Sequence, residues 1–209
     1  ADCAEVLRSG EPTLLMIGGK ALRTEALEVV SRIANQTGAT LMTEFGTART
    51  QRGAGRVTVP RIPYIVDEAL RVTEAYQHIV LVGTKVPIAF FAYPDKPSVL
   101  APQSATEVTL AGKESDALNA LTRLADHLDA PDNPVVINES APYPLGEGSI
   151  DASELGKVIA NRLPENAIVC DEGATNGLGA FLMTANAAPH DWLTLTGGAI
   201  GQGLPLAVG

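Results

Sequence analysis

Short apolar runs alternate along the chain with longer stretches in which apolar residues recur every three or four positions. The runs are strand-sized and lack the polar–apolar alternation of a half-exposed strand; they occupy residues 14–17, 41–42, 79–82 and 108–110. The longer stretches predict amphipathic helices at 22–37, 66–75 and 117–128, the first capped by Gly38. Buried strands followed by helices indicate an α/β fold with a doubly wound, mostly parallel sheet.

A second α/β unit begins after a proline-rich stretch. Residues 131–150 hold four prolines among Asp, Asn, Gly and Ser, which is typical of an extended linker, although 135–137 could add an edge strand. Beyond it, Asp151 begins a capping-box-like helix start, and the pattern then predicts a strand at 167–170, a helix at 174–183, a strand at 193–195 and the start of another helix. We therefore expect a first domain at 1–130, a linker at 131–150 and an incomplete second domain at 151–209.

Composition and charge limit the classes of protein to which the chain could belong. The chain has a formal net charge of −9, which disfavours non-specific binding to nucleic acid or anionic membranes. No apolar run approaches the roughly 20 residues of a membrane span, and the N-terminus lacks the features of a secretory signal. Two distant cysteines, Cys3 and Cys170, do not make a disulfide framework. A cytoplasmic enzyme or binding protein is expected.

The first stretch that could bind a ligand or take part in catalysis is residues 171–176, Asp-Glu-Gly-Ala-Thr-Asn, directly after a predicted strand. Parallel sheets bind ligands beyond the carboxyl ends of their strands, and a helix N-terminus there favours phosphate. The alternative is an ordinary helix-capping turn. Glu172 is expected to take part in the hydrogen bonding of this stretch and not in catalysis.

The second stretch is the glycine-rich segment 196–209, which has five glycines within thirteen residues. Such a segment brings the backbone close to a ligand or to a neighbouring helix. Ile200 is the isolated large apolar residue inside its glycine-rich part. From the residues alone, a ligand loop and a tightly packed helix start both fit.

The segment Gly-Gly-Ala-Ile-Gly-Gln-Gly-Leu-Pro-Leu-Ala-Val-Gly at 197–209 resembles the start of the cofactor helix in thiamine-diphosphate enzymes of the acetolactate synthase type. Residues 1–130 are similar to the middle domain of these enzymes, and residues 151–209 to the start of their diphosphate-binding domain. The resemblance implies thiamine diphosphate and Mg²⁺ as cofactors of a full-length parent. It also implies a 2-keto acid substrate, carbon–carbon bond formation, and a homodimer or homotetramer.

The resemblance also implies roles for individual residues. Ala174 and Thr175 match positions that contact the diphosphate, and the carbonyl of Gly198 matches the acceptor for the 4′-amino group of the pyrimidine ring. Ile200 matches the apolar wedge that keeps the cofactor bent. The family's Gly-Asp-Gly metal motif does not occur, and its N-terminal glutamate domain has no counterpart. We therefore expect no catalytic and no metal-ligating residue in this chain, and no activity from it alone.

Flavin binding is not expected, because residues 84–91 lack the arginines and aspartates found at this place in flavin-binding acetolactate synthases. This departure leaves open a 2-oxo acid decarboxylase of the benzoylformate or oxalyl-CoA type. A non-catalytic nucleotide-binding or scaffold module is the alternative from another class. Gly18-Gly19-Lys20 follows a strand but lacks the spacing of a phosphate-binding loop, and His190 is a weaker active-site candidate.

Overall fold

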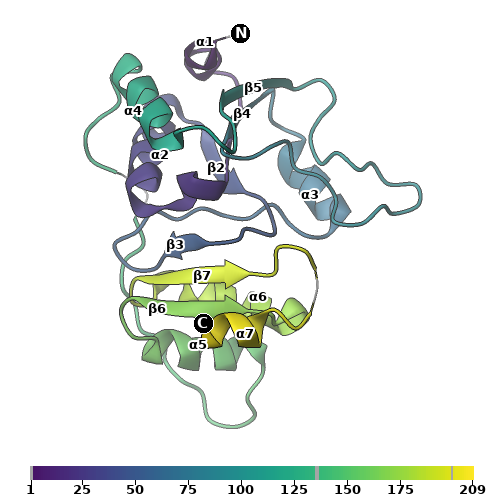
Figure 1. Ribbon diagram of the computed structural model, residues 1–209, viewed down its shortest axis with the longest axis vertical. Helices are drawn as coiled ribbons and strands as arrows, with labels where there is room; N and C mark the ends of the chain where they lie inside the picture. The colour runs from purple at the N-terminus through teal and green to yellow at the C-terminus, as the bar shows by residue number, and fades with distance from the viewer. Residues whose placement is uncertain (1, 135–136, 199) are drawn as a thin grey trace. The chain divides into compact units, whose positions relative to one another are not determined.

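The computed structural model describes residues 2–134, 137–198 and 200–209. The chain divides into two compact units (Figure 1). The first comprises residues 1–45 and 59–135, and the second comprises residues 46–58 and 136–209.

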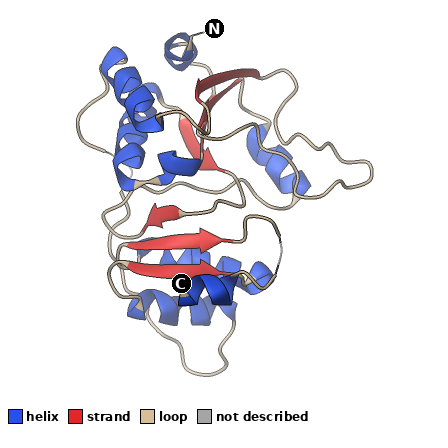
Figure 2. Cartoon of the chain, in the orientation of Figure 1, coloured by secondary structure: helices blue, strands red, loops and turns tan. Residues whose placement is uncertain are grey.

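Four parallel strands form the sheet of the first unit in the order β2-β1-β4-β5 (Figure 2). Leu15 of β1 lies beside Leu41 of β2 on one side and Val80 of β4 on the other. The predicted α/β class with a parallel sheet is confirmed. The strands are β1 (Thr13–Ile17), β2 (Thr40–Thr43), β4 (His78–Val82) and β5 (Thr106–Ala111).

Both faces of this sheet are covered, which explains why its strands show no alternation in the sequence. All five residues of β1 are buried, and neighbouring residues of a strand point to opposite faces. Leu14, Met16 and Ile79 pack in one core cluster with Val66 and Ala69 of α3. The helices of this unit are α1 (Cys3–Arg8), the 3₁₀ turn η1 (Gly19–Leu22), α2 (Thr24–Thr37), α3 (Val66–Thr73) and α4 (Ala117–His127).

The second unit contains a three-stranded sheet in the order β3-β7-β6. Strands β6 and β7 are parallel, as a β-α-β unit requires, and β3 runs antiparallel to β7. Figure 1 shows α6 behind these strands and α7 in front of them. The elements are β3 (Thr50–Arg52), α5 (Ala152–Arg162), β6 (Ala167–Asp171), α6 (Ala174–Met183), the 3₁₀ turn η2 (Thr184–Asn186), β7 (His190–Thr194) and α7 (Gly203–Val208).

The segment 46–58 lies within the range that the sequence analysis took as one domain, yet it packs with the second unit. The backbone N–H of Ala54 donates to the carbonyl of Ala187 over 2.8 Å, and a guanidinium nitrogen of Arg56 donates to the carbonyl of His190 over 2.6 Å. Strand β3 itself was not predicted, because three residues of Thr-Gln-Arg carry no apolar periodicity.

Local signals elsewhere agree with the structure. Gly38 ends α2 in the left-handed conformation, with φ of 74°. Asp151 caps α5 by accepting a hydrogen bond from the N–H of Glu154, but the Glu154 carboxylate is bonded to Gly146 and Lys157. The expected strand at 135–137 includes two residues outside the described ones, and Ile137 forms an isolated bridge with Val57. Within the described ranges, no helix is long and apolar enough to cross a membrane.

Candidate functional site

The β6–α6 turn (residues 171–176) is organised by Asp171, the last residue of β6. Its Oδ1 accepts a hydrogen bond from the backbone N–H of Gly173 over 2.9 Å, and its Oδ2 accepts one from Nε1 of Trp192 over 3.1 Å. Trp192 lies on the neighbouring strand β7 and is 1% exposed. The turn is therefore anchored to the buried part of the second unit.

Two glycines let helix α6 start close to this carboxylate. A Cβ on Gly177 would lie 2.6 Å from Oδ1 of Asp171, and a Cβ on Gly173 would lie 2.8 Å from the Cα of Gly177. Neither position can hold a larger residue without a shift. Ala174 and Thr175, the predicted diphosphate contacts, form the first turn of α6. The N-cap residue Gly173 has no side chain to cap that turn, so the first backbone N–H groups suit an anion.

The β7–α7 loop (residues 195–202) carries the other two predicted contacts. Gly198 has φ of 67°, and Gly201 has φ of 110°, so both positions favour glycine. Ile200 is 84% exposed, so its side chain is not part of the protein core. Ala199 lies outside the described residues. The loop thus presents a large apolar side chain between two residues in glycine-type backbone conformations.

Glu172 connects the turn and the loop. Its carboxylate accepts hydrogen bonds from the backbone N–H groups of Gly201, Gln202 and Gly203, the latter two over 3.1 and 2.9 Å. These hydrogen bonds hold the pKa of the Glu172 carboxyl below its ordinary value, and the bond from Gly201 has the largest effect. The sequence interpretation placed Glu172 in the hydrogen bonding of the β6–α6 turn, whereas these bonds join it to the loop after β7.

A buried layer beneath the site involves residues that sequence reasoning did not assign to it. The guanidinium of Arg52, on β3, lies 3.8 Å from the ring centre of Phe181 and donates to the hydroxyl of Thr184 over 3.1 Å. Phe181 in turn makes an edge-to-face contact with Trp192. Arg52 could not be linked to residues 181–192 from its sequence position, because the connection depends on the antiparallel pairing of β3.

His190 belongs to this buried layer and not to an open site. It is 0% exposed, and the short contact between its Nδ1 and the carbonyl of Ala188, 2.7 Å, assigns the proton to Nδ1. Burial lowers the pKa of His190 from 6.5 to about 4. The imidazole is therefore neutral near pH 7 and acts as a structural group.

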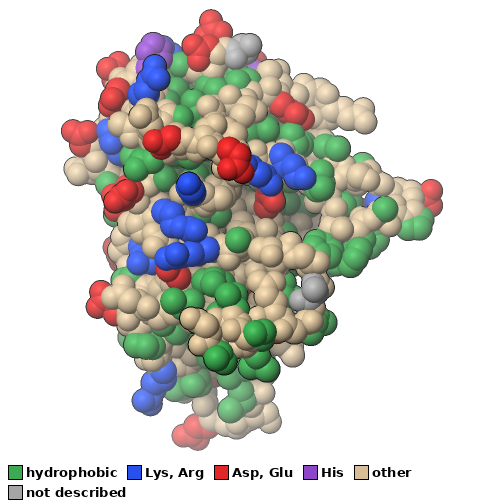
Figure 3. All heavy atoms as spheres, viewed as in Figure 1, with side chains coloured by type: hydrophobic (Ala, Val, Ile, Leu, Met, Phe, Trp, Pro, Cys, Tyr) green, Lys and Arg blue, Asp and Glu red, His purple; other side chains and the backbone are tan. Residues whose placement is uncertain are grey.

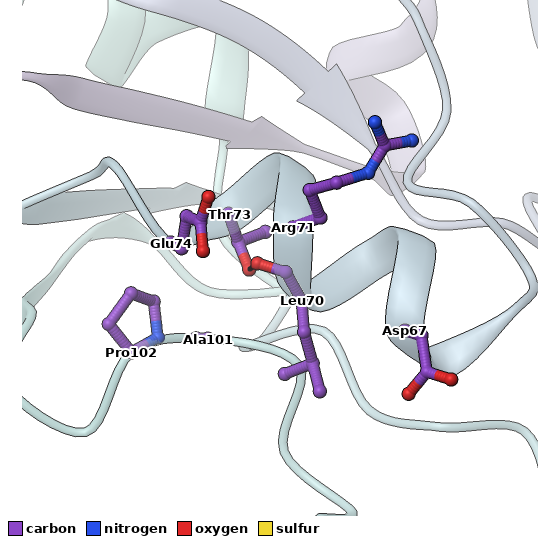
Figure 4. A pocket seen from close by; sticks show the side chains of 7 residues that line it. All are labelled: Asp67, Leu70, Arg71, Thr73, Glu74, Ala101 and Pro102. Atoms are coloured by element: carbon purple, nitrogen blue, oxygen red, sulfur yellow. Dashed lines mark hydrogen bonds between the residues drawn. The ribbon is translucent and has the colours of Figure 1, made fainter.

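The described residues do not assemble a metal centre: no group of three or more His, Cys, Asp or Glu side chains is placed to hold an ion. A shallow hollow of about 390 Å³ lies beside α3 in the first unit (Figure 4). It is lined by Asp67, Leu70, Arg71, Thr73, Glu74, Ala101 and Pro102 and contains none of the predicted site residues. In Figure 3, apolar side chains gather over α7 and β6, where Ile168, Leu204 and Val208 are exposed.

The chain is 41% identical over 206 residues to a protein of Mycobacterium tuberculosis described as "Putative acetolactate synthase large subunit IlvX". The resemblance expected from the sequence is confirmed. The alignment covers 99% of this chain but 40% of the relative, so the chain spans about two fifths of the relative's length. A scan against protein-family models finds no match.

A solved structure described as that of a "putative thiamin diphosphate-dependent enzyme isolated from Mycobacterium smegmatis" shares the fold, with a TM-score of 0.66. It is 21% identical, and the match covers 98% of this chain and 42% of the other. Both comparisons match nearly the whole of these 209 residues to part of a longer protein.

Proposed function

We propose that the chain is part of a thiamine-diphosphate-dependent enzyme that acts on 2-keto acids and forms carbon–carbon bonds in the manner of acetolactate synthase. The observation that carries the proposal is the connection of the β6–α6 turn to the β7–α7 loop through Glu172. This connection supports the proposal because it joins the turn and the loop that carry the predicted cofactor contacts, at the carboxyl ends of two parallel strands, where α/β sheets bind ligands.

The residues present fit thiamine diphosphate. The backbone N–H groups at Ala174 and Thr175, in the first turn of α6, would hold the diphosphate. The carbonyl of Gly198 would accept a hydrogen bond from the 4′-amino group, and the exposed Ile200 would support the bent form of the cofactor. A β-branched side chain has few χ1 states, which suits a rigid support. When bound, the cofactor supplies the carbon nucleophile that attacks the 2-keto acid carbonyl.

Mg²⁺ belongs to the proposal for the full-length enzyme, with ligands outside residues 1–209. The two carboxylates nearest the turn already accept hydrogen bonds. Asp171 accepts them from Gly173 and Trp192, and Glu172 accepts them from the backbone of the β7–α7 loop. We derive no step through the metal. We further propose, from the family resemblance, that the full-length enzyme is a cytoplasmic homodimer or homotetramer.

Calorimetric titration with thiamine diphosphate and Mg²⁺ tests the proposal. Exposed helix-terminus contacts contribute roughly 0.3–1 kcal/mol each, whereas micromolar binding requires about 8 kcal/mol. We expect no micromolar binding and no pyruvate turnover by the 209-residue chain, but saturable binding by the full-length enzyme. Failure of the full-length protein to bind would favour the non-catalytic scaffold. Micromolar binding by the chain alone would contradict our placement of the metal ligands.

A second candidate is a 2-oxo acid decarboxylase, favoured by the absence of the flavin-clamping charged residues at 84–91. Product analysis with pyruvate and with benzoylformate or oxalyl-CoA separates the two. A ligated hydroxy-keto acid supports the synthase. Carbon dioxide with an aldehyde or a formyl thioester as the only products supports the decarboxylase.

A further inference from the structure

Three consecutive backbone N–H groups at the start of α7 converge on a single side chain. Oε1 of Glu172 accepts from Gly201 and Gln202, and Oε2 accepts from Gly203. Glu172 follows strand β6, and its partners follow strand β7, 29 to 31 residues later. One carboxylate thus fixes the far end of the loop that contains Gly198 and Ile200.

The glycines of the loop match this arrangement. A Cβ on Gly203 would lie 2.6 Å from Oε2 of Glu172 and 3.0 Å from its Cβ, so a side chain at 203 would displace the carboxylate. Gly201, with φ of 110°, has a backbone conformation that other residues rarely adopt. The carboxylate therefore explains Gly203 without any ligand, and the backbone conformation explains Gly201.

The charge of Glu172 also separates the roles of the two helix starts. The N-terminus of α7 carries partial positive charge, and Glu172 already neutralises it. At the start of α6, the carboxylate of Asp171 accepts a hydrogen bond from the backbone N–H of Gly173, the N-cap residue. An incoming diphosphate would therefore be excluded from the start of α7, where the Glu172 carboxylate already occupies the backbone N–H groups. The lowered pKa of Glu172 agrees with a carboxylate that stays ionised in this position.

We propose that Glu172 is a positioning residue for the cofactor: by holding the backbone of residues 201–203, it orients the loop that presents Gly198 and Ile200 to the pyrimidine side of thiamine diphosphate. This inference rests on the proposed function but concerns a residue to which the resemblance assigns no role. Glu172 acts through the loop and not on the reacting atoms.

The first experiment needs no cofactor and uses the 209-residue chain. Amide hydrogen exchange of residues 201–203 is measured in the wild type and in Glu172→Gln, Glu172→Asp and Glu172→Ala. Exchange at these amides should accelerate at least tenfold in Glu172→Ala and by less in Glu172→Gln, which keeps one acceptor oxygen. The single tryptophan, Trp192, supplies an indole signal that reports whether the variant is folded.

Glu154→Ala is the matched control. Glu154 lies in the same unit, also accepts a backbone N–H, that of Gly146 over 3.2 Å, and also has a lowered pKa. Its removal should leave exchange at 201–203 unchanged. Equal protection of these amides in the wild type and in all folded Glu172 variants would overturn the proposal. If Glu172→Ala does not fold, the graded response of Glu172→Asp and Glu172→Gln decides the result.

The second experiment separates positioning from simple capping of α7. In the full-length enzyme, Glu172→Gln should weaken binding of thiamine diphosphate about tenfold or more, while binding of inorganic diphosphate, which needs only the α6 side, stays within about twofold. Equal weakening of both ligands, or of neither, would overturn the proposal. A wild-type enzyme that binds inorganic diphosphate but not thiamine diphosphate would instead refute the proposed function, and the exchange experiment would still decide whether Glu172 orders the loop.

Discussion

Each unit contains glycine-rich connections at the carboxyl ends of parallel strands, but different contacts hold these connections in place in the two units. In the first unit, a Cβ on Gly18 would lie 2.7 Å from the Cβ of Thr84, and a Cβ on Gly83 would lie 2.5 Å from the carbonyl oxygen of Gly18. The hydroxyl of Thr84 donates to the carboxylate of Glu44. In the second unit, the connections are joined by the Glu172 carboxylate, and Ile200 remains exposed.

The difference shows how glycine serves two purposes in similar sequence contexts. After β1 and β4, glycine allows two strand ends to pack against each other. After β7, glycine allows backbone N–H groups to approach a carboxylate while an apolar side chain stays available. The first arrangement packs protein against protein, whereas the second leaves the side chain of Ile200 exposed.

The largest expected effect is on the free energy of unfolding, when an apolar side chain is removed from a strand of each unit. Leu15→Ala removes a fully buried side chain of β1 and should lower the free energy of unfolding by about 2–5 kcal/mol. Ile168→Ala, in β6 of the second unit, removes a side chain that is 65% exposed and should change it by less than about 0.5 kcal/mol. Guanidinium denaturation followed by circular dichroism measures both. Similar losses would mean that Ile168 is buried in solution, for example by self-association.

The exposed loop of the second unit should matter for turnover more than for folding. In the full-length enzyme, Ile200→Ala should lower kcat by about 10- to 100-fold, because a misplaced cofactor loses its reactive geometry. The thermal midpoint should hardly move, since Ile200 contributes little to the core. Leu204→Ala, at an equally exposed apolar position of α7, is the control and should retain kcat. An unchanged kcat for Ile200→Ala would contradict the wedge role.

The buried layer of the second unit predicts that the stability of the chain depends on pH through His190. Unfolded histidine has a pKa near 6.5, and that of His190 in the folded chain is about 4. Between these values the unfolded state binds more protons, so the stability is complete above pH 6.5 and falls as the pH drops towards 4. The loss attributable to His190 should be about 1–3 kcal/mol.

Urea denaturation at pH 7 and pH 4.5 tests this prediction. His190→Asn keeps a nitrogen donor for the carbonyl of Ala188 but does not titrate in this range, so its stability should depend less on pH. The same slope in His190→Asn as in the wild type would contradict the assignment.

The smallest expected effect is an absorbance: the full-length enzyme should carry no flavin at the first unit. Residues 84–91 lack the charged side chains that clamp a flavin in related synthases, and Thr84 is buried against Glu44. Purified enzyme should therefore show no flavin absorbance near about 450 nm, the band of the flavin ring itself. A stoichiometric yellow cofactor would contradict this prediction and would favour the biosynthetic synthase.

Much of the fold could be predicted from the sequence because its helices and strands have strong local signals. The α6 range of 174–183 and the C-cap at Gly38 agree with the structure, since periodicity and capping depend on neighbouring residues. For the same reason, the sequence predicted that Ala174 and Thr175 lie at a helix start. It also predicted that Gly198 and Ile200 lie in the loop after β7.

The sequence by itself determined the α/β class, the parallel strands of the first unit and the candidate residues after β6 and β7, because these follow from local patterns and a specific glycine motif. Only the tertiary structure decided that residues 46–58 join the second unit, that Arg52 lies over Phe181, and that Glu172 binds the backbone of 201–203. Each of these contacts joins positions 29 or more residues apart. Long-range pairings of this kind have no periodic signature in the chain and depend on how the strands come together in space.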